Sequence, residues 1–150
     1  MILRKGLWFG KGSILAEGAS LGDSFEVDLE ILEDNDGMTL TGRLLEAVEG
    51  DVSIRVAPND VGTYTIDARI ASVAVDGIAK LESEPNLALL WNEGQTLAVT
   101  ATLFMTDTGV GCRGFLREGD RTRTWEILFK PKQEVVGGGN VVSLANRRRQ

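Results

Sequence analysis

Glycines spaced as in a dinucleotide-binding loop are the first candidate for chemistry in this sequence. Residues Gly109 to Gly114 read GVGCRG, which matches the pattern G-x-G-x-x-G. Such a loop binds a pyrophosphate only where it joins a strand to a helix inside a parallel βαβ unit. The residues that follow here, FLREGDRTRTW, have the pattern of a hairpin. We therefore interpret these glycines as parts of a turn and of a bent strand.

A run of acidic residues is a second candidate, for a calcium site. The stretch LEDNDG, residues 32–37, is similar to the start of an EF-hand loop. An EF-hand needs an acid at its first position and a glutamate at its twelfth, where this chain has Leu32 and Arg43. A hairpin turn at Asp36-Gly37 accounts for the cluster instead, and we predict no metal site.

The absence of histidine removes several kinds of active site. The chain contains no histidine, which excludes Ser-His and Cys-His nucleophile pairs, histidine-ligated zinc and haem held by a proximal histidine. Cys112 alternates into an apolar face, the setting of an inert buried thiol. The only support for an enzyme that uses Tyr64 or an acid as its catalytic group is analogy with other proteins built on such a barrel. We therefore expect a protein that is not an enzyme and has no cofactor.

Length and composition indicate one ordinary globular domain. The chain has 150 residues, of which 43% are hydrophobic and 25% charged, enough for a core without disulfides. No apolar run is long enough to span a bilayer, and the basic N-terminal residues are not followed by the apolar region of a signal peptide. A single cysteine cannot form an intrachain disulfide, so we expect a cytoplasmic protein.

Charge is distributed unevenly between the body of the chain and its end. The net charge is −6, yet Arg147, Arg148 and Arg149 stand together, so residues 1–146 carry −9. An acidic body repels a phosphate backbone, and we expect no nucleic-acid partner. Three glycines precede this basic end, and we expect residues 134–150 to form a flexible tail.

Alternating apolar and polar residues predict short strands along most of the chain. The clearest stretch is 24–31. We expect the next turn at Asp36-Gly37, which places Glu30 opposite Arg43. Five acids then fall on predicted outward faces: Glu26, Asp28, Glu30, Asp67 and Glu126.

Breaks in this alternation predict three further details. Leu44-Leu45 predicts a β-bulge. The stretch 64–81 shifts phase near Ser72 and meets a turn signal at Asp76-Gly77, so it is one bent strand or two short ones. The stretch LALLW, residues 87–91, fits either a short helix or a strand, and we favour a strand.

Together these strands predict an all-β fold, an antiparallel up-and-down β-barrel of 8–10 strands over residues 1–133. A barrel is favoured because closure removes free strand edges, and nearly every strand has one apolar face. The predicted interior is apolar with one phenol: Trp8, Ile14, Phe25, Val27, Leu29, Ile31, Met38, Leu40, Ile54, Tyr64, Ile66, Leu97, Val99, Leu103, Trp125, Ile127 and Phe129.

The opening GLWFGKG, Gly6 to Gly12, resembles the start of the calycin group, the lipocalins and their bacterial lipocalin-like relatives. The resemblance implies a lipocalin-like barrel in which Trp8 closes one end and a basic residue after the last strand, Lys130 or Lys132, lies across it. The opening is also similar to that of the nitrobindin-like haem barrels. Their haem binding is not implied, because the histidine that binds the iron has no counterpart in this chain.

An apolar barrel interior leads to a hypothesis of ligand binding. We expect non-enzymatic binding of a small apolar or amphipathic molecule inside the barrel. Small residues at Gly42, Ala68, Ala101 and Gly114 leave room for it. The residues expected to contact the ligand are Phe25, Leu29, Met38, Tyr64, Ile66, Val99, Leu103 and Trp125.

The alternative is a filled barrel that serves as a protein-interaction or structural module, in the form of a homodimer. Its contact patch would combine LALLW with the outward residues Leu32, Leu45, Phe104 and Leu128. The two hypotheses differ in which face of the sheet meets the partner.

Overall fold

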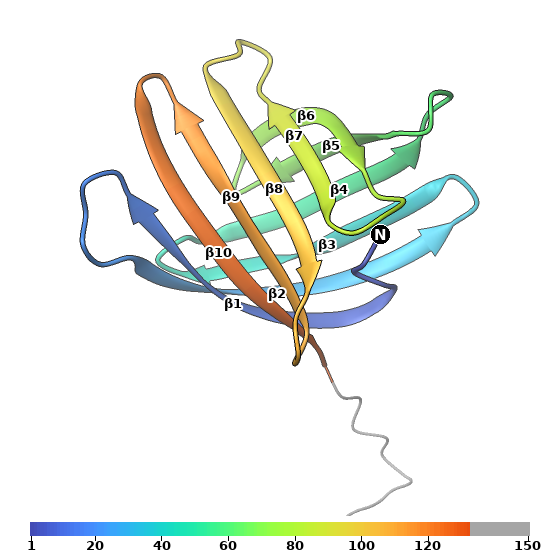
Figure 1. Cartoon of the computed structure of the whole chain (residues 1–150), viewed down its shortest axis with the longest axis horizontal. Coiled ribbons are helices and arrows are strands. Elements are labelled where there is room, and N and C mark those ends of the chain that lie inside the picture. Colours follow the sequence, from blue (N-terminus) through green and yellow to red (C-terminus); the bar gives the residue numbers. More distant parts are fainter. Residues whose placement is uncertain (133–150) are drawn as a thin grey trace, which may run out of the picture.

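The computed structural model describes residues 1–132, which form a closed barrel of ten antiparallel strands (Figure 1). Each strand pairs with its neighbours along the chain, and β1 closes the barrel by pairing with β10. The predicted all-β, up-and-down barrel is confirmed, and the predicted tail lies outside the described residues. The strands are β1 (Gly6–Ala16), β2 (Asp23–Asp34), β3 (Gly37–Glu46), β4 (Gly50–Pro58), β5 (Tyr64–Ile70), β6 (Val73–Lys80), β7 (Asn86–Trp91), β8 (Leu97–Met105), β9 (Val110–Glu118) and β10 (Arg121–Pro131).

The hairpin between β2 and β3 turns one residue earlier than predicted. Asp34 pairs with Gly37, so the turn residues are Asn35 and Asp36 rather than Asp36 and Gly37. The carboxylate of Asp34 accepts a 2.7 Å hydrogen bond from the backbone N–H of Asp36, which stabilises this turn. All pairs therefore shift by two residues, and Glu30 faces Thr41 instead of Arg43. A shift of two preserves the side-chain faces, so the predicted apolar face is correct.

Two other details of the strand prediction are wrong. Pairing between β2 and β3 continues without a break past Leu44-Leu45, so there is no bulge; Leu45 simply occupies an outward position opposite Glu26. The chain turns at Ala71-Ser72, where both residues have positive φ (50° and 70°), as a type I′ turn requires. The Asp76-Gly77 pair lies inside β6. LALLW lies in a strand, as predicted.

The core lies along the inner face of the barrel. Every residue predicted to face the interior is either buried or packed against the buried cluster. On β2 the inward side chains of Phe25, Val27, Leu29 and Ile31 keep at most 7% of their surface exposed. Burial of one such side chain contributes about 1.5–3 kcal/mol to stability. Alternation along β2 therefore both defines this strand and provides a large part of the hydrophobic stabilisation.

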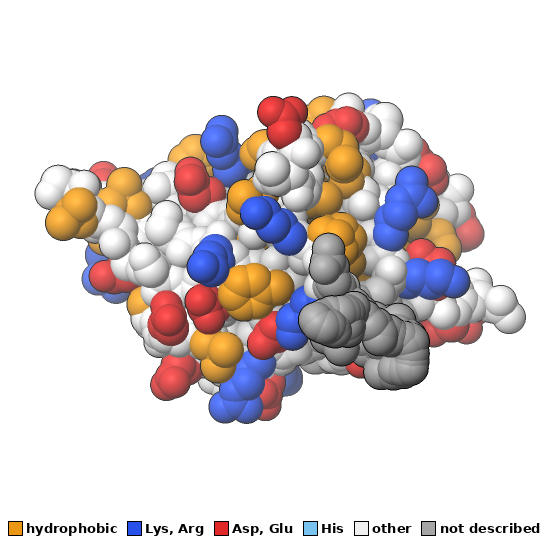
Figure 2. All heavy atoms as spheres, turned by 90° about the horizontal axis from the view of Figure 1, so that it is seen from below, with side chains coloured by type: hydrophobic (Ala, Val, Ile, Leu, Met, Phe, Trp, Pro, Cys, Tyr) orange, Lys and Arg blue, Asp and Glu red, His pale blue; other side chains and the backbone are white. Residues whose placement is uncertain are grey.

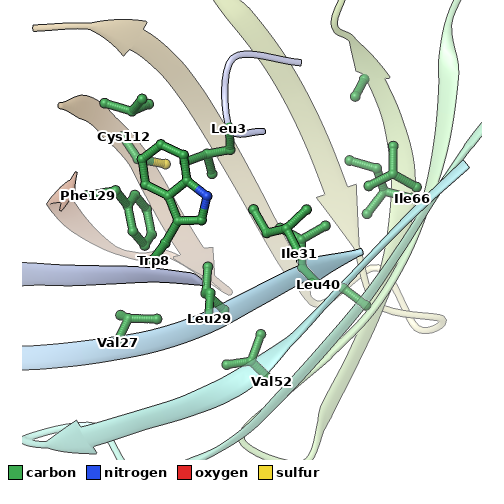
Figure 3. Close-up of a cluster of buried hydrophobic side chains, with 14 of the residues drawn as sticks. Leu3, Trp8, Val27, Leu29, Ile31, Leu40, Val52, Ile66, Cys112 and Phe129 are labelled. Atoms are coloured by element: carbon green, nitrogen blue, oxygen red, sulfur yellow. The ribbon is translucent and has the colours of Figure 1, made fainter. Parts of the chain in front are cut away.

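One end of the barrel is closed by Trp8 together with residues that precede the first strand. Trp8 is 8% exposed and Leu3 is 3% exposed, and Figure 3 shows the indole between Leu3 and Phe129. The indole Nε1 donates a 2.7 Å hydrogen bond to the carbonyl oxygen of Arg4. Buried Asn86 holds the same segment by accepting a 2.8 Å hydrogen bond from the backbone N–H of Ile2.

The lysines implied by the calycin resemblance do not pack on the indole. Lys130 points outward from β10, opposite Phe9. The ammonium of Lys132 lies 2.7 Å from the carboxylate of Asp28, on the outside of the barrel. The resemblance is therefore wrong at this position, because Leu3 and the main chain of Arg4 cover Trp8 instead.

The outer surface carries charges of both signs. Figure 2 shows the lower face, where Lys and Arg side chains are interspersed with Asp and Glu. Ion pairs such as Arg43–Asp51, with 3.4 Å between Nη1 and Oδ1, are solvent-exposed and contribute little to stability. No helix within residues 1–132 has the length and apolar character needed to cross a bilayer.

Candidate ligand-binding site

The inner wall of the barrel is sealed on one side and accessible on the other. The inward side chains of β2 are buried, whereas all four inward side chains of β8, from Leu97 to Leu103, keep contact with solvent. Trp125 and Ile127 on β10 are also only half-buried. A barrel filled to normal density by its own side chains would bury these residues. Solvent therefore reaches the inner face of β8 and β10.

Cross-strand neighbours on this accessible wall form a line of small residues. Trp125 of β10 faces one end of the line and Tyr64 of β5 faces the other. Because the side chains between Trp125 and Tyr64 are short, the inner wall extends least far into the barrel along this line. We call this line the small-residue row, and its members are Gly114, Ala101, Ala88 and Ala79, on β9, β8, β7 and β6.

Two of the small residues predicted to leave room serve close packing instead. A Cβ at Gly114 would lie 2.6 Å from Cζ2 of Trp125, so the indole already fills that space. A Cβ at Gly42 would collide with a carbonyl oxygen of β2. Of the other two residues, Ala68 is buried and Ala101 keeps contact with solvent. Space on the inner wall is therefore expected at Ala101 and Ala88, which keep contact with solvent, and not at Ala79, which is 4% exposed.

The eight residues predicted to contact a ligand all point into the barrel, but they do not form one site. Three are sealed in the core: Phe25, Leu29 and Ile66. Met38 lies at the start of β3, away from the row. Four flank or face the small-residue row: Tyr64, Val99, Leu103 and Trp125.

A separate pocket of about 180 Å³ lies where β3 begins. Its lining includes the apolar Met38, the phenol of Tyr64 and the carboxylates of Glu33 and Asp34. Asp34 accepts two 3.0 Å hydrogen bonds from the guanidinium of Arg55, which holds the pKa of Asp34 below its ordinary value. A carboxylate held ionised in this way belongs to a structural ion pair and is a poor general base.

Tyr64 donates a 2.8 Å hydrogen bond from its hydroxyl to the carboxylate of Glu82. This hydrogen bond, with a smaller effect of burial, raises the pKa of Tyr64 above its ordinary value. Because the neutral phenol is the donor, the stabilising effect is present below the ordinary pKa of tyrosine and is lost as pH rises through the raised value.

Replacing Glu82 by glutamine is therefore expected to lower the pKa of Tyr64. The chain has a single tyrosine, so the phenolate absorbance in an alkaline titration reports on this residue alone. The pKa of the variant should move toward the ordinary value of tyrosine, because a neutral amide does not disfavour the phenolate as a carboxylate does. An identical titration curve for the wild type and Glu82→Gln would contradict the hydrogen bond.

A second hollow, of about 330 Å³, lies on the outside of the barrel over β8, β9, β10 and β1. The guanidinium of Arg113 lies 5.3 Å from the centre of the Phe104 ring, and its Nε is 3.9 Å from the carboxylate of Glu126. Arg113 thus has its own partners within this groove. The inner wall, in contrast, presents apolar side chains on β8 and β10 that pack against the core and yet stay partly exposed.

The nucleophilic and metal-binding chemistry of the described residues is sparse. Cys112 is buried, and burial raises the pKa of its thiol to about 12, so the predicted inert thiol is confirmed. No three Cys, Asp or Glu side chains are grouped to hold a metal ion within residues 1–132. Cys112 and Tyr64 both stay protonated near neutral pH, which leaves neither as a base or nucleophile.

A scan against protein-family models found no match to this chain, and a search of curated proteins also found none. The closed up-and-down barrel is compatible with a lipocalin-like architecture.

Proposed function

We propose that this protein binds a small apolar or amphipathic molecule inside the barrel, without converting it chemically. The observation that carries the proposal is the partial exposure of inward apolar side chains on β8 and β10. Covering apolar surface that water still touches is favourable by about 25 cal/mol per Å². A ligand over the small-residue row would gain this free energy without displacing the side chains of the sealed wall.

The chemistry of the wall indicates the kind of molecule it accepts. The small-residue row is uncharged and lies between the rings of Trp125 and Tyr64, which suits an elongated apolar body. Arg123 stands two residues before Trp125, on the same side of β10 and exposed. It provides a cation for the polar group of an amphipathic ligand. Because Cys112 is a free buried thiol, we also propose a reducing compartment, such as the cytoplasm.

Titration with an environment-sensitive fatty acid and an aromatic probe tests this function. We expect saturable fluorescence for the wild type. Ala101→Phe places a ring on the small-residue row and should weaken probe binding roughly tenfold or more. Ala98→Phe is the matched control, because Ala98 is on the same strand and half-buried but points outward. Absence of saturable binding across the probe panel, or equal weakening by both variants, would refute the proposal.

A further inference from the structure

Three strands of one part of the barrel present large apolar side chains on its outside. Ile78 is 50% exposed, Leu87 46%, Leu89 43% and Phe115 56%. They belong to β6, β7 and β9, and Trp91 lies on the same side of β7 as the two leucines. An exposed apolar cluster of this kind on a folded domain marks an interaction surface.

The strand register aligns the residues at the centre of this surface as cross-strand neighbours, and none of them is charged. Ile78 pairs with Leu89, Leu89 with Thr100, and Thr100 with Phe115. We call these four residues the outer row. The line continues with Thr65 on β5 and Thr124 on β10, so six adjacent strands contribute no charge to it. On β2, in contrast, the outward side chains of Glu26, Asp28 and Glu30 are all acidic.

Opposite charges flank this surface along the next line of residues. On β6, Asp76 stands directly opposite Asp67 of β5, an unfavourable arrangement for two carboxylates. On β9, Arg117 lies on the same line, beyond Trp91 and Ala98. Neither Asp76 nor Arg117 makes an ion pair with any residue of the described chain. Along this line the surface thus carries carboxylates on the side of β6 and a guanidinium on the side of β9.

We propose that the outer face of β6–β9 binds a second copy of this chain, around a two-fold axis that runs along the strands between β7 and β8. Such an axis reverses the order of the strands in the second copy. It also places each cross-strand line of residues of one copy directly opposite the same line of the other copy. Asp76 of each copy then lies opposite Arg117 of the other, so the charge contact forms twice. Ile78 lies opposite Phe115, and Leu89 lies opposite Thr100.

Two features of the barrel fit this arrangement. A closed barrel has no free strand edge, so association must use a face. Lys80 would lie opposite Arg113 of the second copy, but Arg113 already has partners in its own chain, because its guanidinium lies over the ring of Phe104 on β8 and its Nε is 3.9 Å from the carboxylate of Glu126 on β10. Because few large apolar side chains take part in the contact, we expect a weak dimer that dissociates at about micromolar concentration.

Sedimentation velocity over protein concentrations from about 1 µM to about 1 mM tests the dimer. The wild type should shift from monomer to dimer across this range. Phe115→Glu should weaken dimerisation roughly tenfold or more, because it buries a charge against Ile78 of the second copy. Leu32→Glu is the matched control, since Leu32 is 57% exposed on the outside of β2 and outside the contact. Both variants change exposed positions, and circular dichroism should confirm that each folds.

A charge exchange tests the orientation. Asp76→Arg and Arg117→Asp should each weaken dimerisation, and the double variant should restore it to within about threefold of the wild type. A wild type that stays monomeric over the whole range would overturn the proposal, and the exposed face would then need a different protein as its partner. A dimer insensitive to Phe115→Glu, or a double variant no tighter than the single ones, would overturn it equally.

Discussion

Replacing Trp8 by alanine is expected to lower the free energy of unfolding by about 3–5 kcal/mol, as truncation of a large core side chain does. Trp8 is 8% exposed and fills the end of the barrel between Leu3 and Phe129. The variant also loses the hydrogen bond from the indole to the carbonyl oxygen of Arg4. Urea denaturation followed by circular dichroism measures the loss.

The outward tryptophan of the same barrel provides the control. Trp91 is half-buried on the outside of β7, and at concentrations where the protein is monomeric Trp91→Ala should cost no more than about 1 kcal/mol. Trp8→Phe should retain part of the lost stability, because a phenyl ring refills some of the volume. If Trp8→Ala unfolds at the same urea concentration as the wild type, Trp8 does not close the barrel.

Leu3→Ala is the second large change we expect, with a loss of about 2–5 kcal/mol. Leu3 precedes the first strand, yet it is 3% exposed and belongs to the core cluster. Its truncation would leave a cavity beside Trp8 and loosen the segment that Asn86 holds through Ile2. The same urea experiment measures this loss.

Leu7→Ala is the control that shows whether the loss of stability is specific to Leu3 or follows from any leucine truncation near the start of the chain. Leu7 is 42% exposed on the outward side of β1, so its truncation should change stability by no more than about 0.5 kcal/mol. Equal stabilities of Leu3→Ala and Leu7→Ala would mean that residues 1–5 do not close the barrel end.

Alternation was enough to predict the faces of the strands but not their pairing. The inward side of β2 could be predicted from Phe25, Val27, Leu29 and Ile31 because a period of two is a property of one strand alone. The β2–β3 register depends on which two residues form the turn, and the carboxylate of Asp34 favours Asn35-Asp36 by accepting a hydrogen bond from the backbone N–H of Asp36. The Ala71-Ser72 turn has no glycine, asparagine or aspartate, so its residue types did not predict it. The shift of phase near Ser72 did indicate two short strands, and β5 and β6 confirm that alternative.

The candidate site was predictable only in part for a related reason. Trp125 and Tyr64 stand out as aromatic residues on inward faces, but Ala79, Ala88 and Ala101 are common residues on three separate strands. They form a row only once the register of β6 to β9 is known. The closing segment could not be predicted either, because Leu3 lies outside any alternating stretch and is fixed by contacts distant in sequence.

A crystal structure of the protein with the fluorescent fatty acid at saturating concentration tests the central claim most directly. We expect electron density for the acyl chain inside the barrel, over Ala101 and Ala88, with one end at Trp125 and the carboxylate toward Arg123. Density for the probe only on the outer surface, with the inner wall closed by its own side chains, would contradict it.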